Sequence, residues 1–306
     1  AGLISPRSVV RSHFPLPKKK YYMSKSKEVS DKFNFLKPIE YRNMIRLGNK
    51  HDGGYVVPDD LTKKTDVLIS FGYGYDATFE YDYIRFTSNK VHIYDYSCNL
   101  FYLVKLFLKY LKRFLIFKKK FKDVKYHYTN LKNHLLFIQN KMINFQKRKI
   151  VSRKSSNPSA YVMSHSAGEI PLFKKDITIN KIFDEINFQN AFLKCDIEGS
   201  EYYIIDDILE YQDRIDVITF EFHWVDKNLE LFTESIKKIL KYFSIVHIHG
   251  NNHNPLVKNI NIPEVPEITL VNNKFINEKK YVTNFPRQNL DNPNNFTIDD
   301  LFFHFK

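Results

Sequence analysis

The chain has 306 residues, of which 43% are hydrophobic and 16% aromatic, so wholesale disorder is excluded and a large packed core is expected. Its 47 basic and 34 acidic residues give a formal net charge of +13, which favours anionic partners without choosing among nucleic acid, acidic lipid headgroups and charged glycans. The two cysteines, Cys98 and Cys195, are too few for a disulfide framework and indicate a reducing compartment.

The first 30 residues are predicted to form a flexible basic arm. They hold Pro6, Pro15 and Pro17 and the run 18–20 of three lysines, and the first 20 residues contain no continuous apolar stretch of the kind found in a secretory signal. We therefore expect a cytoplasmic protein, with attachment to the periphery of a membrane as an open alternative. Residues 31–306 are predicted to form one domain with an insertion at 100–150.

A short strand at 55–57 follows the paired glycines Gly53 and Gly54. An apolar run at 66–71 then has the character of a buried strand, breaks at a turn containing Gly72 and Gly74, and is followed by a predicted helix at 77–85. A second strand at 91–94 stops at Asp95. Strand, glycine turn, helix, strand and acid together indicate the first unit of a parallel, doubly wound sheet.

The same rhythm returns after residue 176. We predict helices at 177–186, 201–211 and 233–242, and strands at 191–195, 215–222, 244–249 and 267–271, followed by an extended Asn- and Pro-rich tail. The predicted fold class is α/β, a Rossmann-like, doubly wound and mostly parallel sheet with a basic helical insertion.

The insertion departs from this rhythm. Residues 101–117 are densely apolar and are interrupted by Lys105, Lys109, Lys112 and Arg113 at a spacing of three to four residues, which predicts a basic amphipathic helix. A second helix is expected at 128–143, and a basic loop at 146–158. Between residues 105 and 125 there are nine Lys or Arg residues and one acid, Asp123.

Three functions of the insertion remain open. Residues 101–125 form either a surface that docks on an anionic membrane or acidic acceptor, a lid that packs on the core with solvated lysines outside, or a nucleic-acid surface, which no recognised motif supports. The segment is too interrupted to span a bilayer.

The glycine turn and Asp95 form a candidate ligand site. Glycine permits close approach of the backbone at the end of the first strand, while a third glycine of the dinucleotide fingerprint is missing, which disfavours a bound pyrophosphate. Asp95 follows Gly74 by about 20 residues, the spacing at which an acid accepts hydrogen bonds from a ribose. The alternative for the glycines is a structural turn, and for Asp95 a loop cap.

The segment 193–201 places three acids directly after an apolar strand. Asp196, Glu198 and Glu201 therefore lie at the sheet edge where open α/β sheets bind ligands. A carboxylate there can deprotonate a hydroxyl, ligate a divalent cation or hold an ammonium group. Alternatively, Glu198 and Glu201 merely favour the start of the following helix.

These segments resemble the FkbM-type methyltransferases. The resemblance rests on residues 52–55, 70–76 with Phe79 and Glu80, 94–95, 194–201 and 220–223, of which the Lys-x-Asp-x-Glu-Gly-x-Glu segment is the most specific. It spans roughly residues 38–99 and 145–275, so the basic stretch between them lies outside it. The resemblance implies O-methylation with S-adenosylmethionine, often on sugars of polyketides, capsules and surface glycans, and makes residues 31–306 a methyltransferase domain.

Site residues follow from this interpretation. The predicted cofactor-binding residues are Gly72, Gly74, Tyr75, Asp76, Asp95, Tyr96, Asp196 and Glu198. The predicted substrate-binding residues are Asp52, Gly54, Tyr55, Glu201 and His249. The acceptor is expected to be a sugar or glycan. A nucleic-acid methyltransferase and a non-catalytic module that binds membranes or anions are the alternatives.

The predicted catalytic residues are Asp196, Glu221 and His223. Glu221 and His223 alternate at the end of a strand and so share a face of the sheet. In one hypothesis, Asp196 or His223 is the general base that removes a proton from the acceptor hydroxyl. In the other, Asp196, Glu221 and His249 bind Mg²⁺ or Mn²⁺, which acidifies two vicinal hydroxyls. A third interpretation leaves the histidines as strand caps.

Overall fold

The structure, a computed structural model, describes residues 26–116, 118, 120–152 and 176–306. Residues 1–25 of the predicted arm lie outside this range. The arm does not extend to residue 30, because β1 (Lys27–Glu28) pairs with β14 (Phe303–His304) in a small sheet completed by β13 (Asn284–Phe285).

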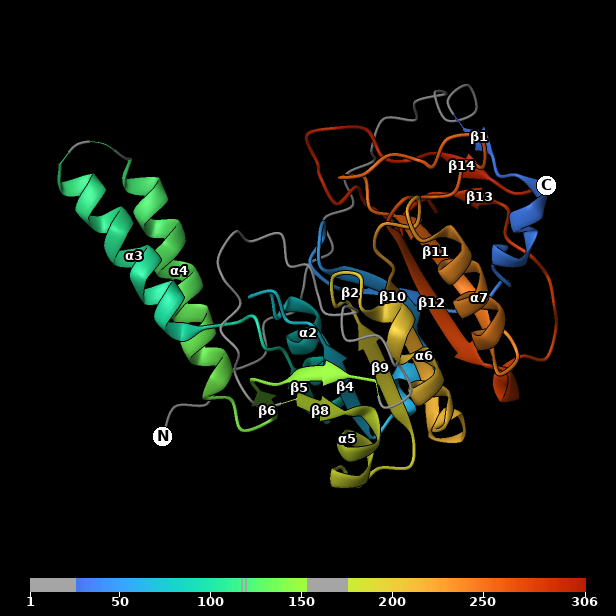
Figure 1. Ribbon diagram of the computed structural model, residues 1–306, viewed down its shortest axis with the longest axis horizontal. Helices are drawn as coiled ribbons and strands as arrows, with labels where there is room; N and C mark the ends of the chain where they lie inside the picture. The colour runs from blue at the N-terminus through green and yellow to red at the C-terminus, as the bar shows by residue number, and fades with distance from the viewer. Residues whose placement is uncertain (1–25, 117, 119, 153–175) are drawn as a thin grey trace, which may run out of the picture.

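A seven-stranded sheet forms the centre of the molecule (Figure 1). In spatial order its strands are β11 (Phe243–Gly250), β12 (Pro266–Asn272), β10 (Ile215–Glu221), β9 (Ala191–Cys195), β4 (Val67–Phe71), β5 (Lys90–Tyr94) and β6 (Ile143–Gln146). Only β12 is antiparallel to its neighbours. The predicted Rossmann-like, mostly parallel sheet is confirmed, with one antiparallel strand added to the dinucleotide-binding order.

Apolar side chains fill both faces of this sheet, as expected for parallel strands. Alternate residues of β4 and β9 point to opposite sides. One core contains α5 (Ile179–Glu185), α6 (Glu201–Leu209) and α7 (Leu229–Ile239), and the other contains α1 (Asp59–Lys64) and α2 (Thr78–Thr87). The hairpin of β2 (Met44–Gly48) and β3 (Gly54–Pro58) adds to the second core.

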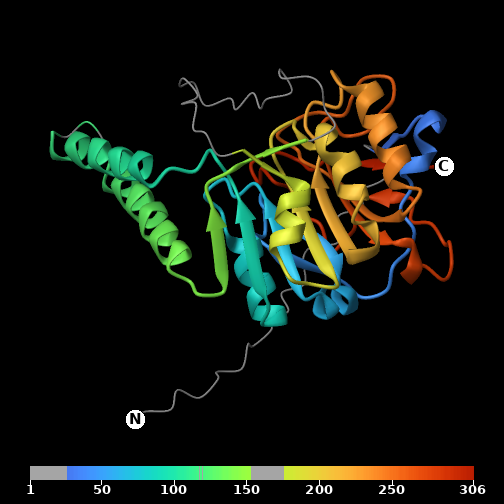
Figure 2. The ribbon, with the colours of Figure 1, turned by 60° about the horizontal axis from the view of Figure 1, so that its bottom comes forward.

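The insertion is a pair of helices, α3 (Leu100–Leu115) and α4 (Phe121–Ile138), that extends away from the sheet in both views (Figures 1 and 2). The second helix begins earlier and ends earlier than we predicted. Residues 143–146 form β6, so the 100–150 insertion is helical only as far as residue 138. The segment 146–158, predicted as a loop, includes β7 (Lys149–Val151), which pairs with β8 (Asp176–Thr178); residues 153–158 lie outside the described range.

The base of this hairpin packs on the glycine turn. The Tyr73 ring stacks on Phe137 of α4 with centroids 4.3 Å apart and on His134 at 5.6 Å. The Tyr73 hydroxyl also lies 3.2 Å from His134 Nδ1. Stacked aromatic pairs add stability beyond the area that they bury, so α4 and the turn form one packed unit.

Both cysteines are buried and free, in agreement with the absence of a disulfide framework predicted from the sequence. No helix in the described part of the chain is both long and apolar enough to cross a bilayer.

Candidate functional site

Four strands end beside one another at the carboxyl edge of the sheet. Because β4, β5, β9 and β10 are parallel, the turn after Phe71, Asp95, Asp196 and the pair Glu221–His223 come to the same edge. The parallel direction and the spatial order of these strands therefore bring most of the predicted site together.

Gly72 and Gly74 have different roles in the turn. Gly72 has φ +86°, and a Cβ there would stand 1.7 Å from the backbone oxygen of Asp196. Gly74 has φ +55°, and no described atom lies within 4 Å of the place of a Cβ. Gly72 is thus required for packing of β4 against the end of β9, whereas Gly74 leaves open space where a ligand can approach the backbone.

Asp95 stabilises the glycine turn, and both of its carboxylate oxygens already accept hydrogen bonds. Its carboxylate accepts hydrogen bonds from Tyr73 N (2.8 Å), Gly74 N (3.1 Å), Ser97 N (2.7 Å), Ser97 Oγ (2.6 Å), Cys98 N (3.3 Å) and Cys98 Sγ (3.3 Å). A carboxylate offers about four lone-pair sites, so these donors saturate it. The geometry favours the loop-capping alternative for Asp95 over the ribose role.

Tyr75, Asp76 and Tyr96, the other predicted cofactor-binding residues of this region, differ in whether their polar side-chain atoms already have hydrogen-bond partners. Tyr75 accepts a hydrogen bond from Asn99 N at 2.7 Å, and Asp76 accepts one from Thr78 N at 2.8 Å at the start of α2. The Tyr96 hydroxyl is buried without a hydrogen-bond partner among the described residues. An unpaired buried hydroxyl is costly, so the Tyr96 hydroxyl, directly after β5, is a candidate ligand contact; the Tyr94 hydroxyl in β5 has no partner among the described residues either.

Asp196 and Glu221 are joined through one phenol. The buried Tyr55 hydroxyl lies 3.2 Å from Asp196 Oδ2 and 3.1 Å from Glu221 Oε2. A phenol has a single proton, so it donates to one carboxylate at a time. Burial, followed by the two carboxylates, raises the pKa of Tyr55 well above its ordinary value, and the hydroxyl remains a donor at neutral pH.

His223 lies in the middle of the carboxylates. Its Nδ1 is 3.1 Å from Glu201 Oε1, while Nε2 is 3.5 Å from Glu198, 3.7 Å from Glu221 and 3.9 Å from Asp196. Glu201 Oε1 also accepts hydrogen bonds from Ile197 N (2.9 Å) and Gly199 N (3.2 Å). Glu201 was predicted to bind substrate, but in the structure it is buried and orients His223 and the turn after β9.

The electrostatics of this cluster follow from burial and like charge. Burial raises the pKa of Asp196, against the lowering effect of Lys194 and His223. Burial and the neighbouring Asp196 raise the pKa of Glu221 well above its usual range. Burial alone would lower the pKa of His223, but the carboxylates of Glu201, Glu221 and Asp196 raise it well above its ordinary value. His223 is therefore cationic at neutral pH, and the two acids become stronger bases than exposed carboxylates.

Of the acids around His223 Nε2, Asp196 and Glu198 keep exposed surface. The side chain of Asp196 is 28% exposed and that of Glu198 61%, whereas that of Glu221 is 7% exposed. A substrate that enters from solvent meets Asp196 before Glu221.

Lys194 of β9 stabilises the glycine turn. Its Nζ donates a hydrogen bond to the Gly72 carbonyl at 3.0 Å and lies 3.5 Å from the fully buried Glu80. Ser70 Oγ donates to the same Glu80 oxygen at 2.7 Å. This buried ion pair connects α2 with β9, and the hydrogen bond from Ser70 adds β4. Lys194 and Glu80 therefore have a structural role beside the site.

The predicted metal set is wrong in one member. His249 does not reach Asp196 and Glu221, because β12 lies between β10 and β11. Its Nδ1 lies 2.9 Å from Glu267 and its Nε2 lies 3.2 Å from Asp300. Instead His223 joins the two acids, and ligand atoms of Asp196, Glu221 and His223 lie within 4.8 Å of one another. This set has the residue types that bind a divalent cation, and such binding would require His223 in its neutral form.

A second polar layer continues from Glu221 toward the C-terminal segment. Asn251 Nδ2 donates to Glu221 at 3.0 Å, and Asn294 Nδ2 donates to Glu267 at 2.6 Å and to Asp52 at 3.1 Å. Sequence analysis gave neither Asn251 nor Asn294 a role in the site, although Asn251 belongs to the Asn- and His-rich stretch at the end of β11. Asp52, predicted to contact substrate, is exposed at the edge of this layer.

Gly54, also predicted to contact substrate, has a structural role in the β2–β3 hairpin. A Cβ on Gly54 would stand 1.9 Å from the Asn49 carbonyl oxygen. Glycine is needed there for the close approach of two backbones.

No family model and no curated protein matches the sequence. Among solved structures, a protein of Pyrococcus horikoshii provisionally named an RNA methyltransferase aligns with 10% identity over 67% of this chain and 74% of its own, at a TM-score of 0.29. The 23S rRNA methyltransferase ErmE aligns with 9% identity over 70% of this chain and 66% of its own, also at 0.29. Neither alignment is close enough to bear on the function of this chain.

Proposed function

We propose that this chain is an S-adenosylmethionine-dependent O-methyltransferase of the FkbM type that acts on a hydroxyl of a sugar or glycan. The observation that carries the proposal is the meeting of an open glycine turn, at Gly74, with the carboxylate–imidazole cluster of Asp196, Glu221 and His223 at one edge of the sheet. A donor bound at the turn and an acceptor bound at the cluster would lie side by side.

Residues of the chain fit the cofactor, with one departure. Gly74 leaves room beside its backbone, the Tyr96 hydroxyl has no hydrogen-bond partner among the described residues, and Glu198 has an exposed carboxylate that suits a cationic group. The departure is Asp95, whose oxygens are occupied by the turn and its own loop. Tyr96 and Glu198 are therefore our primary candidates for cofactor binding. The bound cofactor would supply a methyl group already activated by its sulfonium.

The protein's own chemistry is then limited to alignment and proton removal. Asp196 is more exposed than Glu221 and accepts the proton of the acceptor hydroxyl. His223, cationic and held by Glu201, stabilises the ionised form of the carboxylate pair. Tyr55 donates its hydrogen bond to the pair and keeps the carboxylates in place.

A hydroxyl acceptor suits this edge of the sheet. The groups beside the catalytic cluster are carboxylates and amides, among them the exposed Asp52, which hydrogen-bond well to polyhydroxylated ligands. The sugar or glycan assignment depends on the FkbM resemblance.

The experiment is calorimetric titration with S-adenosylmethionine and S-adenosylhomocysteine, with and without Mg²⁺, followed by single-turnover methyl transfer to candidate sugars. Asp196→Asn should retain cofactor binding and lose turnover by roughly 10²–10⁴-fold, the usual contribution of a general base. Asp184→Asn, an exposed acid on α5, is the matched control. Lack of binding under both conditions would refute the cofactor, and full activity of Asp196→Asn would refute the base.

A further inference from the structure

The α3–α4 hairpin has a free end far from the sheet. In Figures 1 and 2 only the base of the hairpin adjoins the body, while the end of α3 and the start of α4 lie away from it. The helices are packed on each other through aromatic pairs, Phe107–Tyr128 at 5.8 Å and Phe114–Phe121 at 5.7 Å between ring centroids. This packing uses one apolar face of α3.

The described residues leave a second apolar face of α3 uncovered. Positions 101, 104, 108, 111 and 115 recur at intervals of three and four and so lie along one side of the helix. Phe101, Leu108 and Leu115 on this side are 73%, 54% and 66% exposed. At the hairpin end they are joined by Ile116, 49% exposed, and Phe121, 63% exposed. A contiguous group of exposed apolar side chains indicates an interaction surface.

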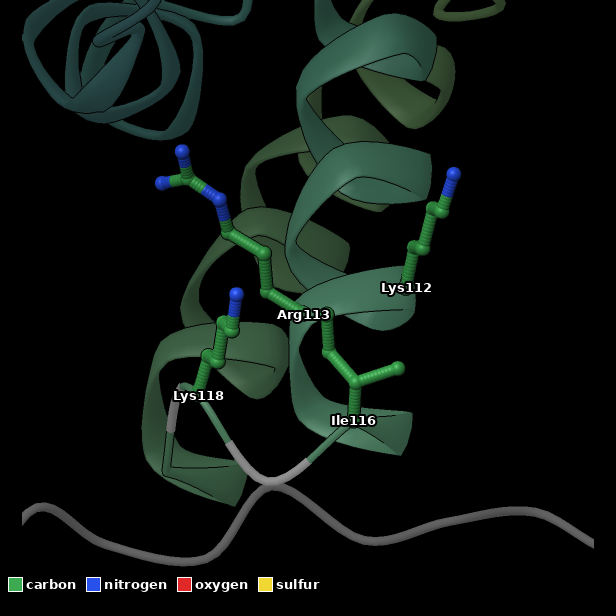
Figure 3. Close-up of a pocket in the computed structure, with 4 residues that line it drawn as sticks. All are labelled: Lys112, Arg113, Ile116 and Lys118. Carbon is green, nitrogen blue, oxygen red and sulfur yellow. The ribbon is translucent and has the colours of Figure 1, made fainter.

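Cations surround the apolar residues at the hairpin end. The described residues between 112 and 125 include one acid, Asp123, and the bases Lys112, Arg113, Lys118, Lys120, Lys122 and Lys125. A hollow of about 450 Å³ at this end is lined by Lys112, Arg113, Ile116 and Lys118. Figure 3 shows Arg113 and Lys118 extending to the same side of the hairpin end and Lys112 to the other. Two convergent cations in a concave surface suit a phosphate group.

We propose that the end of the α3–α4 hairpin docks on the surface of an anionic lipid bilayer. Leu115, Ile116 and Phe121 would enter the boundary between headgroups and acyl chains, and the surrounding lysines and Arg113 would contact lipid phosphates. The hairpin rests on the bilayer and does not span it, in agreement with its charged sequence.

Aliphatic exposure favours lipid over nucleic acid as the partner. Single-stranded nucleic acid is held by cations together with aromatic rings on which bases stack. Leu115 and Ile116, which are 66% and 49% exposed beside Lys112 and Arg113, offer no stacking surface, whereas the exposed rings of Phe121 (63%) and Tyr126 (62%) suit the headgroup boundary of a bilayer as well as they suit a base. The boundary between lipid headgroups and acyl chains accommodates aliphatic side chains.

The test is co-sedimentation of the full chain with vesicles of phosphatidylcholine alone or with added phosphatidylserine. The protein should bind only the anionic vesicles, and binding should weaken as salt is added. In Arg113→Gln/Lys118→Gln, each lost cation should reduce the partition coefficient about five-fold, or roughly 30-fold together. Leu115→Ser/Ile116→Ser, which changes exposed side chains only, should also reduce binding.

The matched control is Lys241→Gln/Lys258→Gln, which removes the same charge near β11, the edge strand opposite to β6. It should bind as the unchanged protein does. Equal binding of the two vesicle types, or unchanged binding of both hairpin variants, would overturn the proposal. So would loss of single-stranded RNA binding in the hairpin variants while vesicle binding stays intact, because the surface would then be a nucleic-acid surface.

Discussion

Replacing Asp95 with alanine separates two roles for this carboxylate. If Asp95 caps the glycine turn, its removal leaves the backbone N–H groups of Tyr73 and Cys98 buried without an acceptor. A hydrogen bond to a charged group contributes about 1.5–3 kcal/mol, so two lost partners cost about 3 kcal/mol at the lower end. The donors of Ser97 are exposed and would turn to water instead.

The assay is urea denaturation followed by tryptophan fluorescence and far-ultraviolet circular dichroism. Asp95→Ala should lower the unfolding free energy by about 3 kcal/mol, and Asp95→Asn, which keeps one carbonyl acceptor, by about half of that. Asp184→Ala is the control. Cofactor affinity should fall as well, because the turn loses its support.

A different outcome would refute the capping argument. If Asp95→Ala loses cofactor affinity while its unfolding free energy changes by less than about 1 kcal/mol, the carboxylate serves the ligand and not the turn.

Three further substitutions test the glycine turn and the general base. Gly72→Ala should fail to fold or lose most of its thermal stability, because a Cβ would stand 1.7 Å from a backbone oxygen, whereas Gly74→Ala should fold at a cost of about 1–2 kcal/mol for a positive φ; equal melting temperatures would contradict the assigned roles. Tyr55→Phe removes a hydrogen bond that lowers the pKa of Asp196, so that pKa should rise and the acidic limb of the pH–rate profile should move to higher pH. An unmoved or lowered limb would separate Asp196 from the rate-limiting proton transfer.

Most of the sheet could be predicted from the sequence because its strands are short apolar runs that end at glycine or acid. The runs at 67–71 and 191–195 belong to this type. Strand β6 was missed because residues 143–146 follow a helix without a glycine or proline between them and are only partly buried. The start of α4 at Phe121 was missed because three lysines precede it and no Ser, Thr, Asp or Asn marks an N-cap.

The site could be predicted as far as neighbouring strands determine it. Asp196, Glu221 and His223 follow β9 and β10, which pair directly, so their proximity follows from strand order. His249 was placed with them on the assumption that β11 lies beside β10. The antiparallel β12 occupies that place, and no local pattern in the sequence reports which strand is inserted between two others. Asn294 came from a segment regarded as an extended tail, where only the tertiary fold brings it to Asp52 and Glu267.

The hydrogen-bonded residues around the site lie far apart in the sequence, which affects the order in which parts of the protein fold. Asp52 and Asn294 are 242 residues apart, and Tyr55 and Glu221 are 166 residues apart. Closing such loops is entropically costly and is rewarded only once the intervening sheet exists. We expect the sheet to form first and the stretch 291–300 to dock afterwards, so that an incompletely folded molecule has a formed glycine turn beside an open, charged and poorly satisfied edge.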